Sequence, residues 1–126
     1  MIQHDVLSNA AEVGEFLMLE LRRIQNDYDD IIVAVRGRGL MIGVEINIAA
    51  YLLAGRVFAA RCMEKGIYVG FYGANAEVIR IEPPLVIALP EAAKILEIIR
   101  EVAAEMQEGT IPAETYNNVH NYSLGI

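Results

Sequence analysis

The sequence predicts an α+β fold, a two-layer sandwich in which three helices cover a small, mainly antiparallel sheet of about four strands. Apolar residues recur at helical spacing over residues 5–26, 50–65 and 90–109. Between these stretches, short runs alternate between apolar and polar residues, as strands do. Short turns join the strands in pairs, which makes the strands of each pair antiparallel neighbours. The predicted order is therefore helix, strand, strand, helix, strand, strand, helix.

The first helix is predicted over residues 5–26, with Asp5 as its N-cap. Its apolar stripe lies opposite a charged side, which is the pattern of an amphipathic helix. Gly14 lies within the apolar stripe. Because glycine has no side chain, this position predicts close packing of the helix against another element.

The next stretch is predicted to form a β-hairpin. A β-branched run over residues 31–35 supplies its first strand, and Gly37 and Gly39 mark the turn. Gly43 lies in the middle of the second strand and predicts a bulge or the close approach of another backbone. A dinucleotide-binding loop is the alternative, but its fingerprint requires a third glycine where Ile42 stands, and a helix where the strand pattern follows. The hairpin is therefore favoured.

A second helix is predicted over residues 50–65, with Gly66 just beyond its end. Cys62 lies on the apolar flank of this helix and is interpreted as a core thiol rather than a nucleophile. It is the only cysteine of the chain, so an internal disulfide is excluded and no metal-binding cluster is predicted.

The remaining pair of strands is predicted over residues 67–72 and 77–82. Within the latter strand, alternation places Arg80 and Glu82 on one face and the two isoleucines on the other. Two prolines follow and end regular pairing, because proline cannot donate a hydrogen bond to a ladder. Arg80 is therefore predicted to lie near the end of a rigid strand.

The last helix is predicted over residues 90–109 and begins at Pro90, a residue that suits the first helical position. Residues 110–126 show no apolar periodicity and are predicted to form an extended or disordered tail. The folded domain is accordingly assigned to residues 1–109.

Composition narrows the class of protein. At 126 residues the chain has the size of one domain. The net charge of −7 argues against nucleic-acid binding, which requires a basic patch. Mean hydropathy is +0.34, yet charged residues interrupt every apolar stretch before the ~20 residues of a membrane span, so no membrane insertion is predicted. The apolar excess predicts contact with another protein surface. The first residues lack the features of a signal peptide, and a cytoplasmic location is expected.

Three segments, taken together and in order, resemble the C-terminal small domain of class III aminotransferases. They are VRGRGLMIGVE at 35–45, CMEKGIYV at 62–69 and VIRIEPPLVI at 78–87. Residues 7–17 are similar to the helix that enters that domain, and the resemblance covers residues 4–108. The family comprises pyridoxal-phosphate enzymes of fold type I, including acetylornithine, ornithine and 4-aminobutyrate aminotransferases.

The resemblance implies a role for Arg80. In the family, the arginine of the segment Arg-x-x-Pro-Pro-Leu reaches into the active site and binds a substrate carboxylate, and Arg80 holds that position here. A guanidinium suits this role because it can grip a carboxylate with two parallel hydrogen bonds. The alternative is a surface or ion-paired arginine. Glu82 departs from the family, which commonly has an uncharged residue there; it either pairs with Arg80 and competes with substrate, or faces solvent. By the same resemblance, Arg36, Gly37 and Gly39 shape the hairpin near the domain interface.

The resemblance also implies what this chain lacks. The family's cofactor lysine, the aspartate that pairs with the cofactor ring nitrogen and the glycine-rich phosphate segment belong to a large domain that would precede residue 1. Lys65 and Lys94 stand outside any matching context and are expected to be solvated surface charges. No catalytic, cofactor-binding or metal-binding residue is therefore predicted here, and the chain alone is expected neither to bind pyridoxal phosphate tightly nor to transaminate.

The complete enzyme is expected to be a homodimer that transfers an amino group between an amino acid or amine and a 2-oxo acid. Which donor and acceptor it uses, and whether it is instead a mutase or racemase, depends on the large domain and stays open. The competing hypothesis is a free-standing, non-catalytic α+β domain that binds a ligand or another protein.

Overall fold

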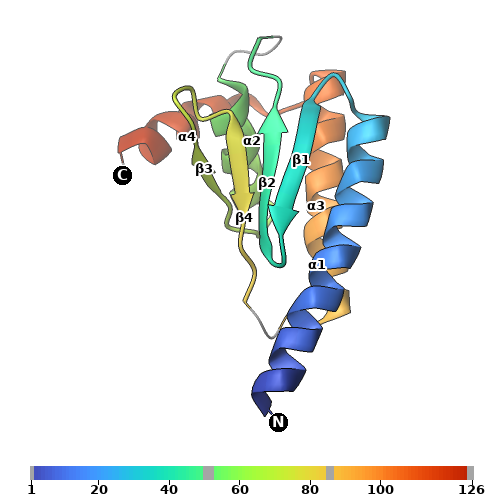
Figure 1. Cartoon of the computed structure of the whole chain (residues 1–126). Helices are drawn as coiled ribbons and strands as arrows, with labels where there is room; N and C mark the ends of the chain where they lie inside the picture. The colour runs from blue at the N-terminus through green and yellow to red at the C-terminus, as the bar shows by residue number, and fades with distance from the viewer. Residues whose placement is uncertain (1, 50–52, 85–86, 125–126) are drawn as a thin grey trace.

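The computed structural model describes residues 2–49, 53–84 and 87–124. Eight elements follow one another along the chain (Figure 1). They are α1 (Ile2–Asp27), β1 (Ile32–Arg38), β2 (Met41–Ile46), α2 (Ala54–Glu64), β3 (Gly70–Tyr72), β4 (Val78–Ile81), α3 (Leu89–Glu108) and α4 (Ala113–Leu124). The predicted α+β class is confirmed, and so is the predicted order as far as α3.

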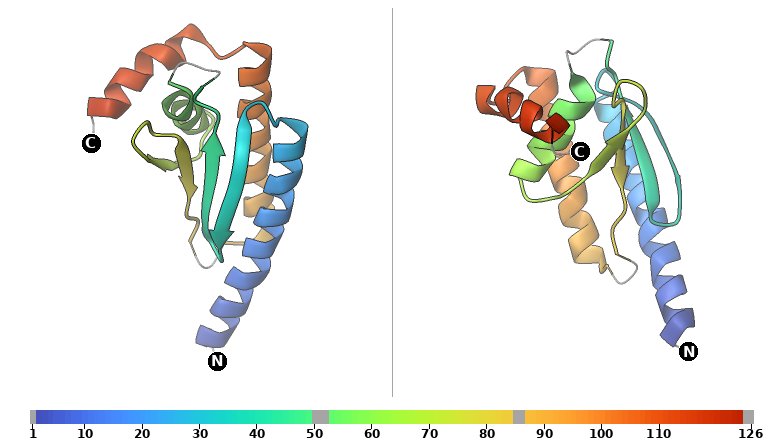
Figure 2. Two further views of the ribbon diagram at one scale, coloured as in Figure 1. Left: turned by 45° about the horizontal axis from the view of Figure 1, so that its top comes forward. Right: turned by 90° about the vertical axis from the view of Figure 1, so that its left-hand side faces the viewer.

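The four strands form one antiparallel sheet in the order β1-β2-β4-β3. Within the described part of the chain, the helices lie on one side of this sheet (Figures 1 and 2). Helix α1 packs against β1, α2 packs against β3 and β4, and α3 packs against α1 and α2. The sheet therefore has one face against the helices and one face that no described element covers, which we call the open face.

Alternation along the strands separates the two faces chemically. Ile42, Val44, Ile79 and Ile81 point toward the helices and are buried. They join a core that α1 extends with a stripe at helical spacing, made of Val13, Leu17, Leu21 and Ile24. The open face carries Arg36, Arg38, Met41, Glu45, Arg80 and Tyr72. Burial of the aliphatic face thus fixes the strand register and turns the charged positions outward.

Gly14 confirms the close packing predicted from the apolar stripe. A Cβ atom at this position would overlap the carbonyl oxygen of Gly39 in the turn between β1 and β2. Gly39 itself has a positive φ of 58°, a conformation that favours glycine. The helix and the hairpin turn therefore meet backbone to backbone.

Two local expectations are corrected by the structure. Helix α1 begins at Ile2, so Asp5 lies inside the helix and is not its N-cap. The bulge expected at Gly43 lies instead on β1, between Ile32 and Ala34. Gly43 keeps regular pairing, and the group that approaches it is a side chain, the hydroxyl of Tyr72, rather than a backbone.

The largest correction concerns residues 110–126, for which an extended or disordered tail was expected. Residues 113–124 form helix α4, which packs against α2. Among residues 110–119, whose burial the structure describes, the buried positions are Ile111, Thr115 and Val119, spaced four residues apart. Thr115 is fully buried because its hydroxyl donates a hydrogen bond of 2.7 Å to Glu64. A polar residue therefore occupies the centre of the buried stripe.

Cys62 confirms the interpretation as a core thiol. Its side chain is fully buried within the hydrophobic core. Burial in these apolar surroundings raises the pKa of the thiol to about 12, although the positive charge of Lys65 acts in the opposite direction. The thiol therefore stays protonated at neutral pH.

Candidate functional site

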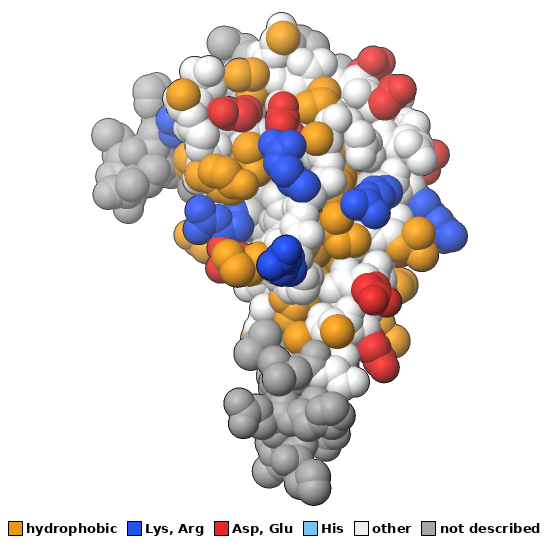
Figure 3. Space-filling model, viewed as in Figure 1, with side chains coloured by type: hydrophobic (Ala, Val, Ile, Leu, Met, Phe, Trp, Pro, Cys, Tyr) orange, Lys and Arg blue, Asp and Glu red, His pale blue; other side chains and the backbone are white. Residues whose placement is uncertain are grey.

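Arg80 lies on β4, an inner strand of the sheet, and its side chain points to the open face. Half of the side chain, 51%, is exposed. In the ladder, Arg80 pairs with Gly43 on β2 and with Gly70 on β3, and Gly43 pairs in turn with Arg36 on β1. Figure 3, viewed onto this face, shows basic side chains gathered over the sheet. The prediction that Arg80 lies near the end of a strand is confirmed by this position.

Within the described residues, Arg80 has two partners. Its Nε atom lies 3.1 Å from Oε1 of Glu82, and its Cζ atom lies 4.9 Å from the ring centroid of Tyr72. Of the two alternatives for Glu82, pairing with Arg80 is therefore the one observed. Because both side chains are about half exposed, solvent screens the ion pair and it contributes little to stability.

Arg36 lies in the same row of the ladder, on β1, with Gly43 of β2 between it and Arg80. Its Nη2 atom donates a hydrogen bond of 2.6 Å to Glu45 on the neighbouring strand. This pair joins β1 to β2 close to the hairpin turn. The contact agrees with the structural role that the sequence assigned to Arg36.

A hollow of about 550 Å³ lies beside the end of β4. Glu82, Pro83 and Tyr68 line one side of it, and Glu91 and Lys94 from α3 line another. The remaining lining residues are glycine, proline and aliphatic residues. Among the described lining residues, the charged groups are two carboxylates and one ammonium, a set that would repel a phosphate group more than attract it.

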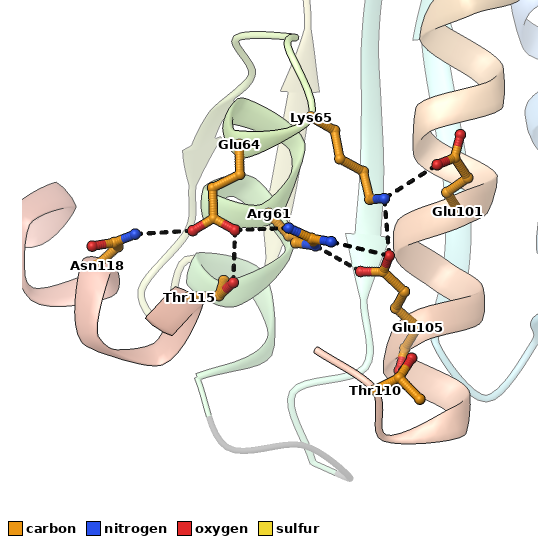
Figure 4. Close-up of polar contacts among 8 residues, drawn as sticks. All are labelled: Arg61, Glu64, Lys65, Glu101, Glu105, Thr110, Thr115 and Asn118. Carbon is orange, nitrogen blue, oxygen red and sulfur yellow. Dashed lines mark hydrogen bonds and ion pairs between the residues drawn. The ribbon is translucent and has the colours of Figure 1, made fainter. Parts of the chain in front are cut away.

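Lys65 belongs to a network of charges that joins three helices (Figure 4). Its Nζ atom lies 3.1 Å from Glu101 and 2.9 Å from Glu105, and only 17% of its side chain is exposed. The hydrogen bond to Glu105 raises the pKa of Lys65, although burial acts against the charged form. The expectation of a solvated surface charge is therefore wrong for Lys65.

Arg61 is at the centre of this network. It donates hydrogen bonds of 2.7 and 3.3 Å to the two oxygens of Glu105, and one of 3.0 Å to Glu64. Glu64 also accepts hydrogen bonds from Thr115 and Asn118 of α4. Burial alone would raise the pKa of both carboxyl groups, but these hydrogen bonds together lower it. The network therefore holds α2, α3 and α4 together.

Pyridoxal phosphate fits neither lysine of this chain. A cofactor lysine must lose its proton to form an imine, whereas the raised pKa of Lys65 keeps this side chain protonated. Lys94 stands in a hollow whose other charged groups are Glu82 and Glu91. Among the described residues, no group of three or more His, Cys, Asp or Glu is placed to hold a metal ion. No described helix is long and apolar enough to cross a membrane.

A family model described as aminotransferase class-III matches residues 1–103. The chain belongs to the class III aminotransferase family. This finding confirms the resemblance read from the three sequence segments. Helix α4 lies beyond the matched residues.

Individual relatives of this class III aminotransferase chain include both aminotransferases and racemases. It is 40% identical over 113 residues to the alanine/serine racemase of Pyrococcus horikoshii, covering 86% of this chain and 23% of that protein. It is 35% identical over 100 residues to ornithine aminotransferase 1 of Staphylococcus saprophyticus, covering 79% and 23% respectively. The chain thus spans about a quarter of the length of these relatives.

Solved structures show the same fold. The acetylornithine aminotransferase of Elizabethkingia anophelis is similar with a TM-score of 0.72 and 26% identity, over 82% of this chain and 25% of that one. A phospholyase from Arthrobacter in complex with phosphoethanolamine gives a TM-score of 0.74 at 24% identity, over 82% of this chain and 26% of that one. The similarity to the phospholyase concerns the fold alone.

Sequence reasoning missed Tyr72 as a neighbour of Arg80. Tyr72 pairs directly with Val78, which places it diagonally next to Arg80 across the β3–β4 ladder. Alternation alone indicates that Tyr72 faces the same side as the other outward residues of its strand. The register that brings the two side chains together depends on the loop between the strands, and a single sequence does not specify it.

Proposed function

We propose that residues 1–109 are the C-terminal small domain of a pyridoxal-phosphate enzyme that transfers an amino group between an amino acid or amine and a 2-oxo acid. Arg80 is the residue of this chain that binds the substrate carboxylate. The observation that carries the proposal is the position of Arg80 on an inner strand of the open face, in a chain of the class III aminotransferase family.

The geometry of the guanidinium supports this role. Glu82 occupies the Nε side of Arg80, and the Cζ atom of Arg80 lies over the Tyr72 ring. The edge that carries the two terminal nitrogens is one of the edges with which arginine can grip a carboxylate in a bidentate manner. A β-strand fixed by neighbours on both sides aims that edge reproducibly. In this assignment Glu82 also competes for the guanidinium, and the substrate carboxylate must bind beside it.

The proposal assigns the cofactor to the part of the enzyme that this chain does not include. Pyridoxal phosphate supplies an electron sink for the reaction when it is bound there. The curated relatives are about four times longer than this chain, which leaves room for a large domain, and the poor fit of Lys65 and Lys94 supports the same assignment. We also propose a homodimer, as the resemblance implies.

Racemisation is a second candidate for the complete enzyme, and the identity of 40% to an alanine/serine racemase favours it. A racemase removes and returns the proton at the substrate α-carbon without exchanging the amino group. Each reaction has a substrate that carries a carboxylate, the 2-oxo acid or amino acid in amino transfer and the amino acid in racemisation, so the proposed role of Arg80 is the same in each.

The test uses the full-length protein that contains these residues. L-Alanine, L-ornithine and putrescine are assayed as amino donors, and L-alanine is also assayed for racemisation. Ornithine and putrescine form a matched pair, because putrescine is the same diamine chain without a carboxylate. We expect Arg80→Ala to lower kcat/KM for the carboxylate-bearing substrate by about 10- to 100-fold, the loss of charge-assisted hydrogen bonds. Cofactor absorbance should be unchanged.

Arg100→Ala is the matched control. Arg100 also pairs with a carboxylate, Asp27, and also stacks on a tyrosine ring, that of Tyr28, but it lies in the helical layer. We expect this control to leave kcat/KM unchanged. If Arg80→Ala has no greater effect than Arg100→Ala, Arg80 is an ordinary surface arginine. If the 126-residue chain alone binds pyridoxal phosphate as a lysine imine, the domain assignment is wrong. Ligand binding by that chain with no further domain in the protein would favour a free-standing binding domain.

A further inference from the structure

The Tyr72 ring reaches across the sheet beneath Arg80. Tyr72 belongs to β3, which is the edge strand, whereas Gly43 belongs to β2, on the far side of β4. A Cβ atom at Gly43 would lie only 3.1 Å from the Tyr72 hydroxyl oxygen. The tyrosine side chain therefore spans the width of β4, with its ring 4.9 Å from Cζ of Arg80.

Glycine at position 43, on β2, makes room for this arrangement. Gly43 and Gly70 are the two residues that pair with Arg80 in the ladder. A Cβ atom at Gly43 would also lie 3.2 Å from Cγ1 of Val78, so a side chain there would be tight against both Val78 and the Tyr72 hydroxyl. A Cβ atom at Gly70 would lie 3.8 Å from Cβ of Arg80. Gly43 thus makes room for the end of the tyrosine side chain.

Two contacts then restrict the guanidinium. The Cζ atom of Arg80 lies over the Tyr72 ring, and Glu82 lies at the Nε side of the guanidinium. An arginine side chain that is half exposed otherwise samples many rotamers, and fixing it on binding costs conformational entropy. A side chain that is already restricted loses less entropy when a carboxylate binds.

We propose that Tyr72 is a positioning residue for Arg80. The tyrosine ring holds the guanidinium over the sheet so that the terminal nitrogens of Arg80 face the substrate carboxylate. Gly43 supplies the space into which the tyrosine hydroxyl extends. This inference rests on the proposed function of Arg80. It adds a residue that acts on substrate affinity through the arginine and takes no part in the chemical step.

The test compares Tyr72→Leu with Tyr72→Phe in the full-length protein. Leucine removes the aromatic ring, whereas phenylalanine keeps it and removes only the hydroxyl. Propionate is used as a competitive inhibitor that carries a carboxylate, and propionamide as its uncharged counterpart. We expect Tyr72→Leu to raise the inhibition constant of propionate about two- to fivefold, the range for a cation–π contact at an exposed site. We expect Tyr72→Phe to leave it unchanged, with propionamide unaffected in both variants. The kcat at saturating donor should also be unchanged.

Gly43→Ala tests the same inference without removing the ring. The added methyl group would lie 3.1 Å from the Tyr72 hydroxyl oxygen, so the tyrosine must shift by a few tenths of an ångström. We expect this shift to weaken propionate binding in the same direction as in Tyr72→Leu. In a Tyr72→Leu background the alanine should have no additional effect, because the ring is already absent. Additive losses would show that Gly43→Ala acts by distorting the sheet, and they would contradict the inference.

Arg80→Ala separates the two proposals. If Arg80→Ala abolishes propionate binding and Tyr72→Leu leaves it unchanged, Tyr72 is not a positioning residue and the proposed function of Arg80 stands. If Arg80→Ala itself leaves propionate binding unchanged, the proposed function fails and the inference fails with it. Equal weakening by Tyr72→Leu and Tyr72→Phe would assign the effect to the hydroxyl and overturn the stacking argument.

Discussion

Replacement of Arg61 by methionine tests the network that joins α2, α3 and α4. Methionine keeps most of the apolar stem of arginine but removes the bidentate pair with Glu105 and the hydrogen bond to Glu64. Breaking a fully buried ion pair costs about 3–5 kcal/mol. Here 20% of the Arg61 side chain is exposed, and Lys65 and Thr115 still contact the two carboxylates. We therefore expect a smaller loss in the free energy of unfolding, about 2 kcal/mol.

The assay is urea unfolding of the 126-residue chain at pH 7, followed by far-ultraviolet circular dichroism. Arg23→Met is the matched control, because Arg23 forms an exposed pair with Glu20 within α1. Such a pair contributes less than about 0.5 kcal/mol. A loss in Arg61→Met no larger than that of Arg23→Met would refute the reasoning, because it would mean that the network is as weak as a surface pair.

The pKa shifts of the two carboxyl groups also predict how the stability difference between wild type and Arg61→Met changes with pH. The pKa values of Glu64 and Glu105 in the folded chain lie below their ordinary value of 4.5, because hydrogen bonds from Arg61 and its neighbours outweigh the effect of burial. The corresponding stability is fully present above the unfolded pKa and is lost as pH falls through the lower, folded pKa. The difference between wild type and Arg61→Met should therefore be largest near pH 7 and shrink on acidification below pH 4.5. A difference that grows with acid would contradict the assigned direction.

Two further predictions concern the core. Cys62 should not react with Ellman's reagent at pH 8 in the folded chain, because burial raises the pKa of its thiol to about 12. It should react fully in urea. Rapid reaction of the native protein would show that the thiol is accessible. Gly14→Ala should lower the free energy of unfolding by about 1–3 kcal/mol, because the new methyl group would overlap the backbone of Gly39. Exposed Glu15 supplies the control, and Glu15→Ala should stay within about 0.5 kcal/mol of wild type in the same urea titration; equal effects of the two substitutions would mean that Gly14 is not tightly packed.

The sequence predicted those elements whose signal is local. Helices α1, α2 and α3 and the two hairpins follow from apolar periodicity, glycine turns and prolines, all of which act within a few residues. Helix α4 was missed because its buried stripe has a threonine at its centre. Thr115 can be buried only because Glu64, which lies far away in the sequence, accepts its hydroxyl hydrogen bond. A pattern based on apolar residues does not contain that information.

In the candidate site, too, local features could be predicted from the sequence, whereas contacts between distant residues could not. The strand position of Arg80 could be predicted from the residues around it, because its strand, its alternation and the prolines that follow are all local features. Its proposed role came from the family resemblance. Its contact with Tyr72 depends on the register between β3 and β4, and the space for that ring depends on Gly43 in a third strand. Lys65 was misread for the same reason, since its partners Glu101 and Glu105 lie on another helix. These contacts are made by residues that lie far apart in the sequence, so the local pattern could not predict them.

The charges that stabilise the domain and the charge proposed to bind substrate belong to different layers. Arg61 and its carboxylate partners join helices, whereas Arg80 lies on the open face of the sheet. The buried aliphatic layer between them contains Val44 and Ile79, which no water or ion reaches. Separate layers predict separate effects: Arg61→Met should lower stability without changing the affinity for a carboxylate, and Arg80→Ala should do the reverse. A change in carboxylate affinity in Arg61→Met would show instead that the helical layer determines where the guanidinium points.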